Sequence, residues 1–144
     1  MTSSSWPEPV PGLVIRYSYL WVSEHERGCE EGVKDRPCAV VLALPGQNVV
    51  VLPITHSPPP DGQAALEIPE SVKRRLRLDS ERSWVVLTEA NHFSWPGPDL
   101  RPRVNGDLST IVYGLLPRSF FHAIREKFLR GVRARTTRLV SRTD

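Results

Sequence analysis

Residues 36–57 read RPCAVVLALPGQNVVVLPITHS, in which two apolar, β-branched runs flank the turn-forming tetrapeptide PGQN. Such runs around a Pro/Gly/Asn cluster predict a β-hairpin of two buried strands. Arg36 opens the first strand and Thr55 closes the second. In an antiparallel pair the start of one strand lies beside the end of the next, so we expect Arg36 and Thr55 to be spatial neighbours. A guanidinium beside a hydroxyl donor is suited to holding a phosphate.

The composition is that of one compact β-rich domain. The chain has 144 residues, enough to bury a core without disulfides or metal. Its hydrophobic content of 40% and charged content of 24% are ordinary for a soluble globular protein. The 14 prolines divide the chain into short segments, which favours a small β fold over a helical bundle.

Strand and helix patterns flank the hairpin on both sides. An amphipathic helix opens at Pro117 and is expected to end near Gly131, because its apolar residues recur at helical spacing. Closure of a sheet removes exposed edges, so we expect a mainly β fold with a terminal α-helix, as a small antiparallel barrel or strongly coiled sheet. The further expected strands are 13–22, 64–68, 83–90 and 110–115, with one or two helical turns over 69–76.

We divide the chain into a flexible leader (1–11), the folded domain (12–131) and an Arg-rich tail (132–144). The net charge of +3 is small, but basic residues cluster over 73–82 and 130–142. Such clusters attract a polyanion or form an ordinary solvated face, and the sequence leaves both interpretations open.

The expected location is the cytoplasm, with reduced thiols at Cys29 and Cys38 and no membrane contact. The sequence has no signal-peptide pattern and no run near the roughly 18 apolar residues of a membrane span. A zinc site of His25, Cys29, Cys38 and His56 is conceivable, but its cysteine spacing matches no common zinc motif. We therefore expect neither a metal nor another cofactor.

The order of the motifs resembles the MazF/PemK toxins of bacterial toxin–antitoxin systems. The resemblance spans Gly12 to about Leu129. It rests on a first strand ending near Trp21, a charged loop, the Arg36-Pro37 strand, the PITHS segment at 53–57, a strand carrying Glu89 and the YGLLP segment at 113–117 that leads into a helix. No single motif is specific, but their order and spacing around two apolar strands are moderately so.

The resemblance implies an SH3-like barrel that forms a homodimer. It also implies metal-independent, sequence-specific cleavage of single-stranded RNA, in which the 2′-hydroxyl attacks the adjacent phosphorus. A cognate antitoxin would block the RNA groove with a disordered segment.

Four residues are predicted to be catalytic. Arg36 would clamp the phosphorane charge and Thr55 would donate a hydrogen bond to a phosphate oxygen. His25 lies between two glutamates, which favours its protonated form and the role of an acid, whereas Glu89 would accept a proton or orient Arg36. Ordinary roles also stay open, as a solvated loop histidine and a strand-end carboxylate. The predicted RNA contacts are Arg36, Thr55, Ser57, Trp95 and Lys73.

Trp95 is the expected stacking partner for an unpaired base, or alternatively fills a subunit contact. His56 is left out of the predicted site, because strand alternation would aim it at the face opposite Thr55 if the strand continued. Two other functions compete with the nuclease. One is a non-catalytic SH3-like module that binds RNA or a peptide, and the other is a dimeric regulator that contacts DNA.

Overall fold

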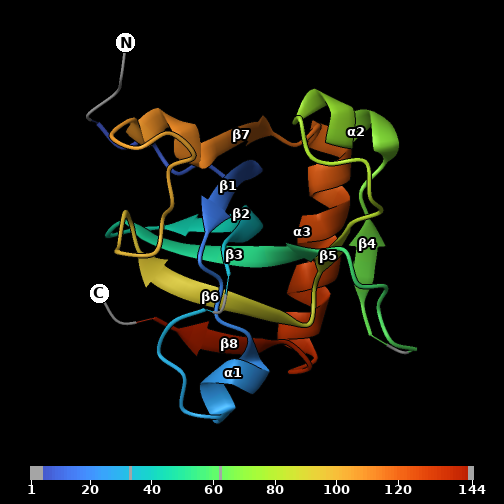
Figure 1. Cartoon of the computed structure of the whole chain (residues 1–144). Coiled ribbons are helices and arrows are strands. Elements are labelled where there is room, and N and C mark those ends of the chain that lie inside the picture. Colours follow the sequence, from blue (N-terminus) through green and yellow to red (C-terminus); the bar gives the residue numbers. More distant parts are fainter. Residues whose placement is uncertain (1–4, 33, 62, 143–144) are drawn as a thin grey trace.

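The computed structural model describes residues 5–32, 34–61 and 63–142, which form eight strands, three α-helices and one 3₁₀ helix (Figure 1). In chain order the elements are β1 (Leu13–Tyr17), α1 (Val22–Glu26), β2 (Arg36–Leu44), β3 (Asn48–Thr55), β4 (Ala65–Glu67), α2 (Glu70–Arg75), β5 (Trp84–Val86), β6 (Glu89–Ser94), η1 (Leu108–Ile111), β7 (Val112–Leu115), α3 (Arg118–Arg133) and β8 (Arg138–Ser141).

The strands form one sheet in the order β4-β5-β3-β2-β1-β7, with β6 paired to β3 and β8 paired to β6. All pairs are antiparallel except β6–β8. The predicted mainly β fold with a terminal α-helix is confirmed. The expected closed barrel is not observed: within the described residues the pairings form an open, branched path.

The branch arises at β3, which pairs along one edge with two different strands. Residues Asn48–Val51 pair with β6, and Ile54–Thr55 pair with β5. Pro53, which has no N–H to donate, lies near the place where β3 changes partner, a position that a proline tolerates within a sheet. The expected single strand over 83–90 is therefore two strands, β5 and β6.

The β2–β3 hairpin has the predicted pairing. Cys38 lies opposite Pro53 and Leu44 opposite Asn48, with a bulge between Val40 and Leu42. Gly46 in the connecting turn has φ +77°, a conformation that glycine adopts without strain.

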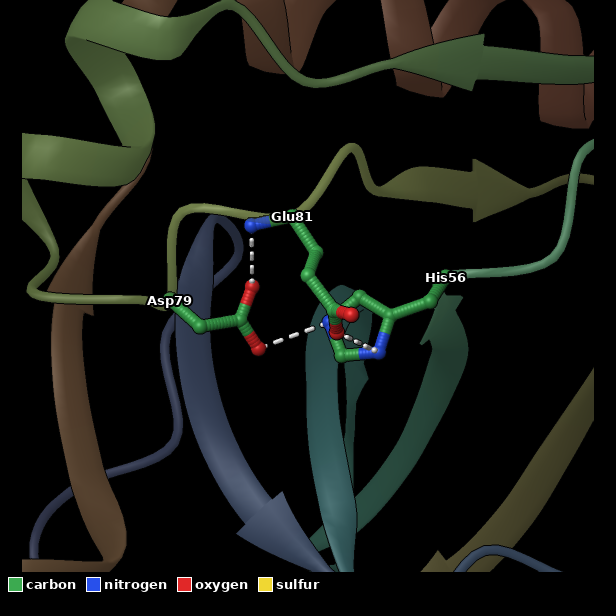
Figure 2. Close-up of side chains that lie close together, drawn as sticks. All are labelled: His56, Asp79 and Glu81. Carbon is green, nitrogen blue, oxygen red and sulfur yellow. Dashed lines mark hydrogen bonds and ion pairs between the residues drawn. The ribbon is translucent and has the colours of Figure 1, made fainter.

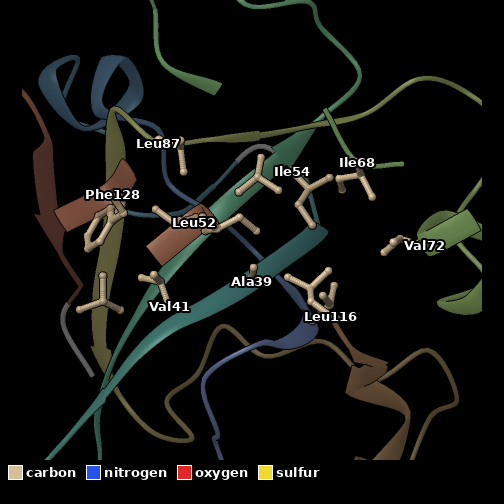
Figure 3. Packing of buried hydrophobic residues seen from close by; sticks show 14 of the residues in the cluster. Ala39, Val41, Leu52, Ile54, Ile68, Val72, Leu87, Leu116 and Phe128 are labelled. Carbon is tan, nitrogen blue, oxygen red and sulfur yellow. The ribbon is translucent and has the colours of Figure 1, made fainter. Parts of the chain in front are cut away.

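Both faces of the β2–β3 hairpin are buried, which explains its unbroken apolar sequence. Ala39 and Val41 point into a cluster that includes Phe128 of α3, whereas Cys38 and Val40 point into a second cluster on the opposite face. Figure 3 shows the first cluster, where side chains of β2 and β3 gather with residues of the helices.

Helix α3 runs past the predicted end at Gly131 and stops at Arg133. Gly131 has a packing role instead, because a Cβ there would lie 2.3 Å from Thr137 Oγ1 in the chain that turns back toward the sheet. That chain forms β8 inside the segment expected to be a tail, and β8 lies beside α1 (Figure 1).

The two ends of the described chain contact the domain. Trp6 packs against the second core cluster, and Trp95 Nε1 donates a hydrogen bond to the carbonyl of Pro7. Arg142 follows β8 and its side chain is only 3% exposed. None of the helices in the described ranges has the length and apolar character required to cross a bilayer.

Candidate active site

A cleft of about 710 Å³ lies where β2 begins and β3 ends. Both Arg36 and Thr55 line it, together with the connector 56–60 after β3 and residues 77–79 after α2. Extending the Cys38–Pro53 pair by two residues along each strand places Arg36 opposite Thr55. The structure therefore brings together the two residues on which the sequence argument rests. The volume is within the usual range for a small-molecule pocket, roughly 300–1,000 Å³.

Arg36 is held by stacking, and it has no ion pair with any carboxylate in the described ranges. Its guanidinium lies 5.0 Å from the centre of the half-buried Trp21 ring. The Nε–H is buried and donates to no group in the described part of the chain. A buried donor without an acceptor costs about 1–3 kcal/mol, and the residue itself still lines the cleft.

Thr55 ends β3 and begins a side-chain turn. Its Oγ1 accepts a hydrogen bond from the backbone N–H of Ser57 at 3.1 Å, which fixes the hydroxyl oxygen and leaves its proton free to donate. Ser57 also lines the cleft and is exposed. Both predicted hydroxyl contacts are thus available to a phosphate in the cleft.

The cleft carries uncompensated positive charge. Lys34, Arg36 and Arg77 line it, and none forms an ion pair with a carboxylate among the described residues. Asp35 and Asp79 also line the cleft, but Asp35 lies 3.5 Å from Arg16 and 3.6 Å from Arg101, and Asp79 lies 3.2 Å from Lys73. Together these groups favour a polyanionic ligand.

His56 lines the cleft, contrary to the expectation from strand alternation. Figure 2 shows its ring between the carboxylates of Asp79 and Glu81, with Nε2 2.7 Å from Asp79 Oδ2 and Nδ1 3.2 Å from Glu81 Oε2. The strand ends at Thr55 and the chain bends at His56, so alternation no longer applies and both residues line the cleft. The run of prolines at 58–60 was the available signal that the strand stops there.

Asp79 is fixed from its other side by Lys73. Lys73 Nζ lies 3.2 Å from Asp79 Oδ1, and the Lys73 side chain is only 6% exposed. Partial burial raises the pKa of Asp79, but the hydrogen bond from Lys73 and the charge and hydrogen bond of His56 outweigh it and hold the pKa below its ordinary value. Asp79 is therefore an ionised, anchored partner for the histidine.

The His56, Asp79 and Glu81 trio also has the composition of a metal site, since donor atoms of these described residues all lie within 4.8 Å of one another. The contacts are those of hydrogen bonds, because the two carboxylates engage different nitrogens of one ring. A single ion ligated by the imidazole would use only one of those nitrogens.

The other two predicted catalytic residues lie outside the cleft. His25 is exposed on α1 and lines a separate hollow with Cys29 and Arg142. Glu89 accepts hydrogen bonds from the Tyr19 hydroxyl at 3.1 Å and from the Val22 backbone at 2.9 Å. The structure thus places neither residue where it would touch a phosphate beside Arg36.

Glu89 is nevertheless connected to Arg36 through aromatic contacts. The Tyr19 ring, bonded to Glu89, packs edge-on against Trp21 at 5.1 Å, and Trp21 supports Arg36. This arrangement supports the orienting role considered for Glu89 and not proton transfer by its carboxylate.

Two predicted RNA contacts are likewise elsewhere. Trp95 is 8% exposed and stacks on Phe93 in the second core cluster. Lys73 is buried and paired with Asp79, behind the cleft wall. Arg77, four residues further on, is the basic residue of this stretch that lines the cleft.

In comparisons with known proteins, no family model, curated protein or solved structure matches this chain. The likeness to MazF/PemK toxins therefore stays a resemblance of ordered motifs, and the site is interpreted from its own geometry.

Glu89→Gln is expected to remove a pH-dependent loss of stability. Burial raises the Glu89 pKa above its ordinary value of 4.5. Protonated Glu89 therefore contributes stability to the folded state below the ordinary pKa of 4.5, and this contribution is lost as the pH rises through the raised pKa. Glutamine stays neutral and still accepts both hydrogen bonds. In urea unfolding between pH 4 and 8, the free energy of unfolding of the variant should increase relative to that of wild type as the pH rises. The increase should be under ~1 kcal/mol, because the carboxyl is only half-buried. A constant difference across this range would contradict the assignment.

Proposed function

We propose that this protein is an endoribonuclease that cleaves single-stranded RNA by attack of a 2′-hydroxyl on the adjacent phosphorus. The observation that carries the proposal is the convergence of Arg36 and Thr55 in one cationic cleft. The Arg36 guanidinium has no carboxylate partner among the described residues, and the Thr55 hydroxyl oxygen is held by the Ser57 N–H in the same cleft.

This chemistry suits the groups in the cleft. The attacking and departing oxygens belong to RNA, so the protein has to hold the phosphate, stabilise the charge of the phosphorane and assist proton transfer. Arginine offers forked donors that match two phosphate oxygens and stays charged at any working pH. Half-buried Trp21 and Tyr113 also line the cleft and offer aromatic surface to a flanking base.

The cellular part of the proposal rests on the motif resemblance described above. On that basis we propose a toxin that acts as a homodimer and is neutralised by a cognate antitoxin. The excess positive charge of the cleft is consistent with an acidic inhibitory segment.

The direct test is incubation of the purified full chain with mixed-sequence single-stranded RNA in excess EDTA, followed by analysis of the new ends. We expect fragments with 2′,3′-cyclic phosphates and free 5′-hydroxyls, and the same yield without EDTA. Intact RNA in both conditions, from protein shown to be folded by circular dichroism, would refute the nuclease. Cleavage that EDTA abolishes would refute the metal-independent chemistry.

A non-catalytic RNA-binding module is the second candidate. It is favoured by the position of His25 and Glu89 outside the cleft, which leaves neither available for proton transfer at Arg36. This alternative predicts salt-dependent binding of RNA without new ends in the assay above.

Arg77→Gln is expected to weaken the salt dependence of RNA binding. Three cations of the cleft, Lys34, Arg36 and Arg77, give an expected slope of log K against log salt of about −2, at roughly −0.7 per phosphate contact on a single strand. The variant should have a slope shallower by about 0.7. The measurement is fluorescence anisotropy with a 2′-O-methyl oligonucleotide, which cannot attack its own phosphate. Arg118→Gln, an exposed change on α3, is the control, and an equal effect of both variants would contradict binding in the cleft.

A further inference from the structure

The proposed reaction needs a proton donor for the departing 5′ oxygen, and His56 occupies the place for one. It directly follows Thr55, the phosphate-contacting residue at the end of β3. Both residues line the same cleft as Arg36. The other three histidines, His25, His92 and His122, lie on α1, β6 and α3, and none of them lines this cleft.

The surroundings of the His56 ring fit its protonated form. Carboxylate oxygens only accept hydrogen bonds, whereas a neutral imidazole has one N–H and one bare nitrogen. Contacts of 2.7 Å to Asp79 and 3.2 Å to Glu81 are both hydrogen bonds only when each ring nitrogen carries a proton. The ring thus has a carboxylate partner at each of its two nitrogens (Figure 2).

The two carboxylates differ in how firmly they are held. Asp79 is anchored through Lys73, whose side chain is 6% exposed, and it also accepts the Glu81 backbone N–H. The Glu81 side chain is 70% exposed and makes the longer contact to His56. A substrate oxygen can therefore replace Glu81 at Nδ1 while Asp79 keeps Nε2 and the orientation of the ring.

The geometry points to His56 as the general acid of RNA cleavage, with Asp79 as its positioning residue; this inference rests on the proposed ribonuclease function. In the step, the 2′ oxygen forms a bond to phosphorus and its proton passes to water. The bond from phosphorus to the 5′ oxygen breaks, and Nδ1–H of the His56 imidazolium protonates that oxygen. Water then returns a proton to the neutral imidazole, so the protein is unchanged after each turnover.

A substrate with a better leaving group separates this role from a structural one. The cut site is first mapped with wild type, and the same RNA is then made with sulfur in place of the bridging 5′ oxygen at that site. A thiolate leaves without protonation, so an enzyme that lacks only its general acid still cleaves this substrate. The variants are His56→Gln and, as a matched control, His122→Gln, which changes an exposed histidine 3.9 Å from Glu126 on α3.

We expect His56→Gln to lower kcat on ordinary RNA by about 10²–10⁴-fold, the usual contribution of positioned proton transfer, with KM within a few-fold of wild type. On the sulfur substrate it should cleave within about tenfold of wild type, since the acid is no longer needed. His122→Gln should match wild type on both substrates.

The other outcomes overturn the inference in distinguishable ways. Normal cleavage of ordinary RNA by His56→Gln, or equal loss on both substrates, would refute the general acid and leave the ribonuclease proposal standing. No cleavage by wild type would remove the proposed function and this inference together.

Asp79→Asn tests the positioning role with the same two substrates. Asparagine keeps the shape of the side chain but loses the charge that holds the imidazole ring, so kcat on ordinary RNA should fall about tenfold while cleavage of the sulfur substrate stays within a few-fold of wild type. An equal fall on both substrates would refute the positioning role. The charged groups around the His56 ring are Asp79, Glu81, the Lys73 ammonium behind Asp79, and the cleft cations Lys34, Arg36 and Arg77.

Discussion

Arg36→Ala is expected to lower RNA cleavage by at least about 10²–10³-fold, because the phosphorane loses its principal charge-stabilising donor. The structure gives this side chain no competing anion among the described residues and leaves its buried Nε–H without an acceptor. Most of the loss should be in kcat, since the clamp is strongest when charge develops on the phosphate. The measurement is single-turnover cleavage of a mapped RNA site.

Arg36→Lys should also be a poor enzyme. Lysine keeps the positive charge but loses the planar fork and its stacking on Trp21, 5.0 Å away. The matched control is Arg82→Ala, which removes a guanidinium 5.0 Å from the Trp84 ring that is already neutralised by Glu67 at 2.7 Å. Cleavage by Arg82→Ala should stay within a few-fold of wild type. If Arg36→Ala were as active as this control, Arg36 would have no part in catalysis.

Arg142→Met is expected to lower the free energy of unfolding by about 1.5–3 kcal/mol, the usual contribution of a hydrogen bond to a charged group, because it removes the nearer of two arginines from Asp99 and leaves Arg101 at 4.0 Å. The Arg142 guanidinium lies 3.1 Å from Asp99, and the two side chains are 3% and 8% exposed. It also donates to the Ser18 carbonyl at 2.8 Å and the Asn91 amide oxygen at 3.1 Å. Urea unfolding followed by tryptophan fluorescence measures the change.

The control lies four residues earlier, at the start of β8. Arg138 also pairs with a carboxylate, Glu26, at 2.9 Å, but the two side chains are 63% and 55% exposed. Arg138→Met should therefore cost less than about 1 kcal/mol. Equally small effects of the two substitutions would show that Arg142 does not hold the C-terminal strand in place.

The hairpin, and the proximity of Arg36 and Thr55 that follows from it, were predictable because both depend on local sequence. The period of apolar residues over 36–57, interrupted by PGQN, fixes two paired strands, and antiparallel pairing then brings Arg36 to Thr55. The terminal helix was predictable for the same reason, through the spacing of its apolar face. Its end was not, because Gly131 continues the helix and packs against Thr137.

The neighbours of the cleft depend on contacts between distant segments. His56 meets Asp79 and Glu81 only because β3 exits beside the connector after α2. Trp95, which was expected to stack on an unpaired base, is instead buried and donates a hydrogen bond to the Pro7 carbonyl. Local sequence patterns also could not predict that the sheet stays open, because this depends on β3 pairing with both β5 and β6 along one edge.

The sequence by itself determined the strand pair, the terminal helix and the meeting of a guanidinium with a hydroxyl, because periodicity and turn residues act within a few positions of the chain. Tertiary structure decided which charges stay unpaired in the cleft, which histidine lies beside Arg36 and Thr55, and that the Arg-rich end forms a strand locked by Arg142 and Asp99. The physical reason is that ion pairs and buried contacts join segments that are far apart in the chain, and the local sequence of each segment does not indicate which other segment it will meet.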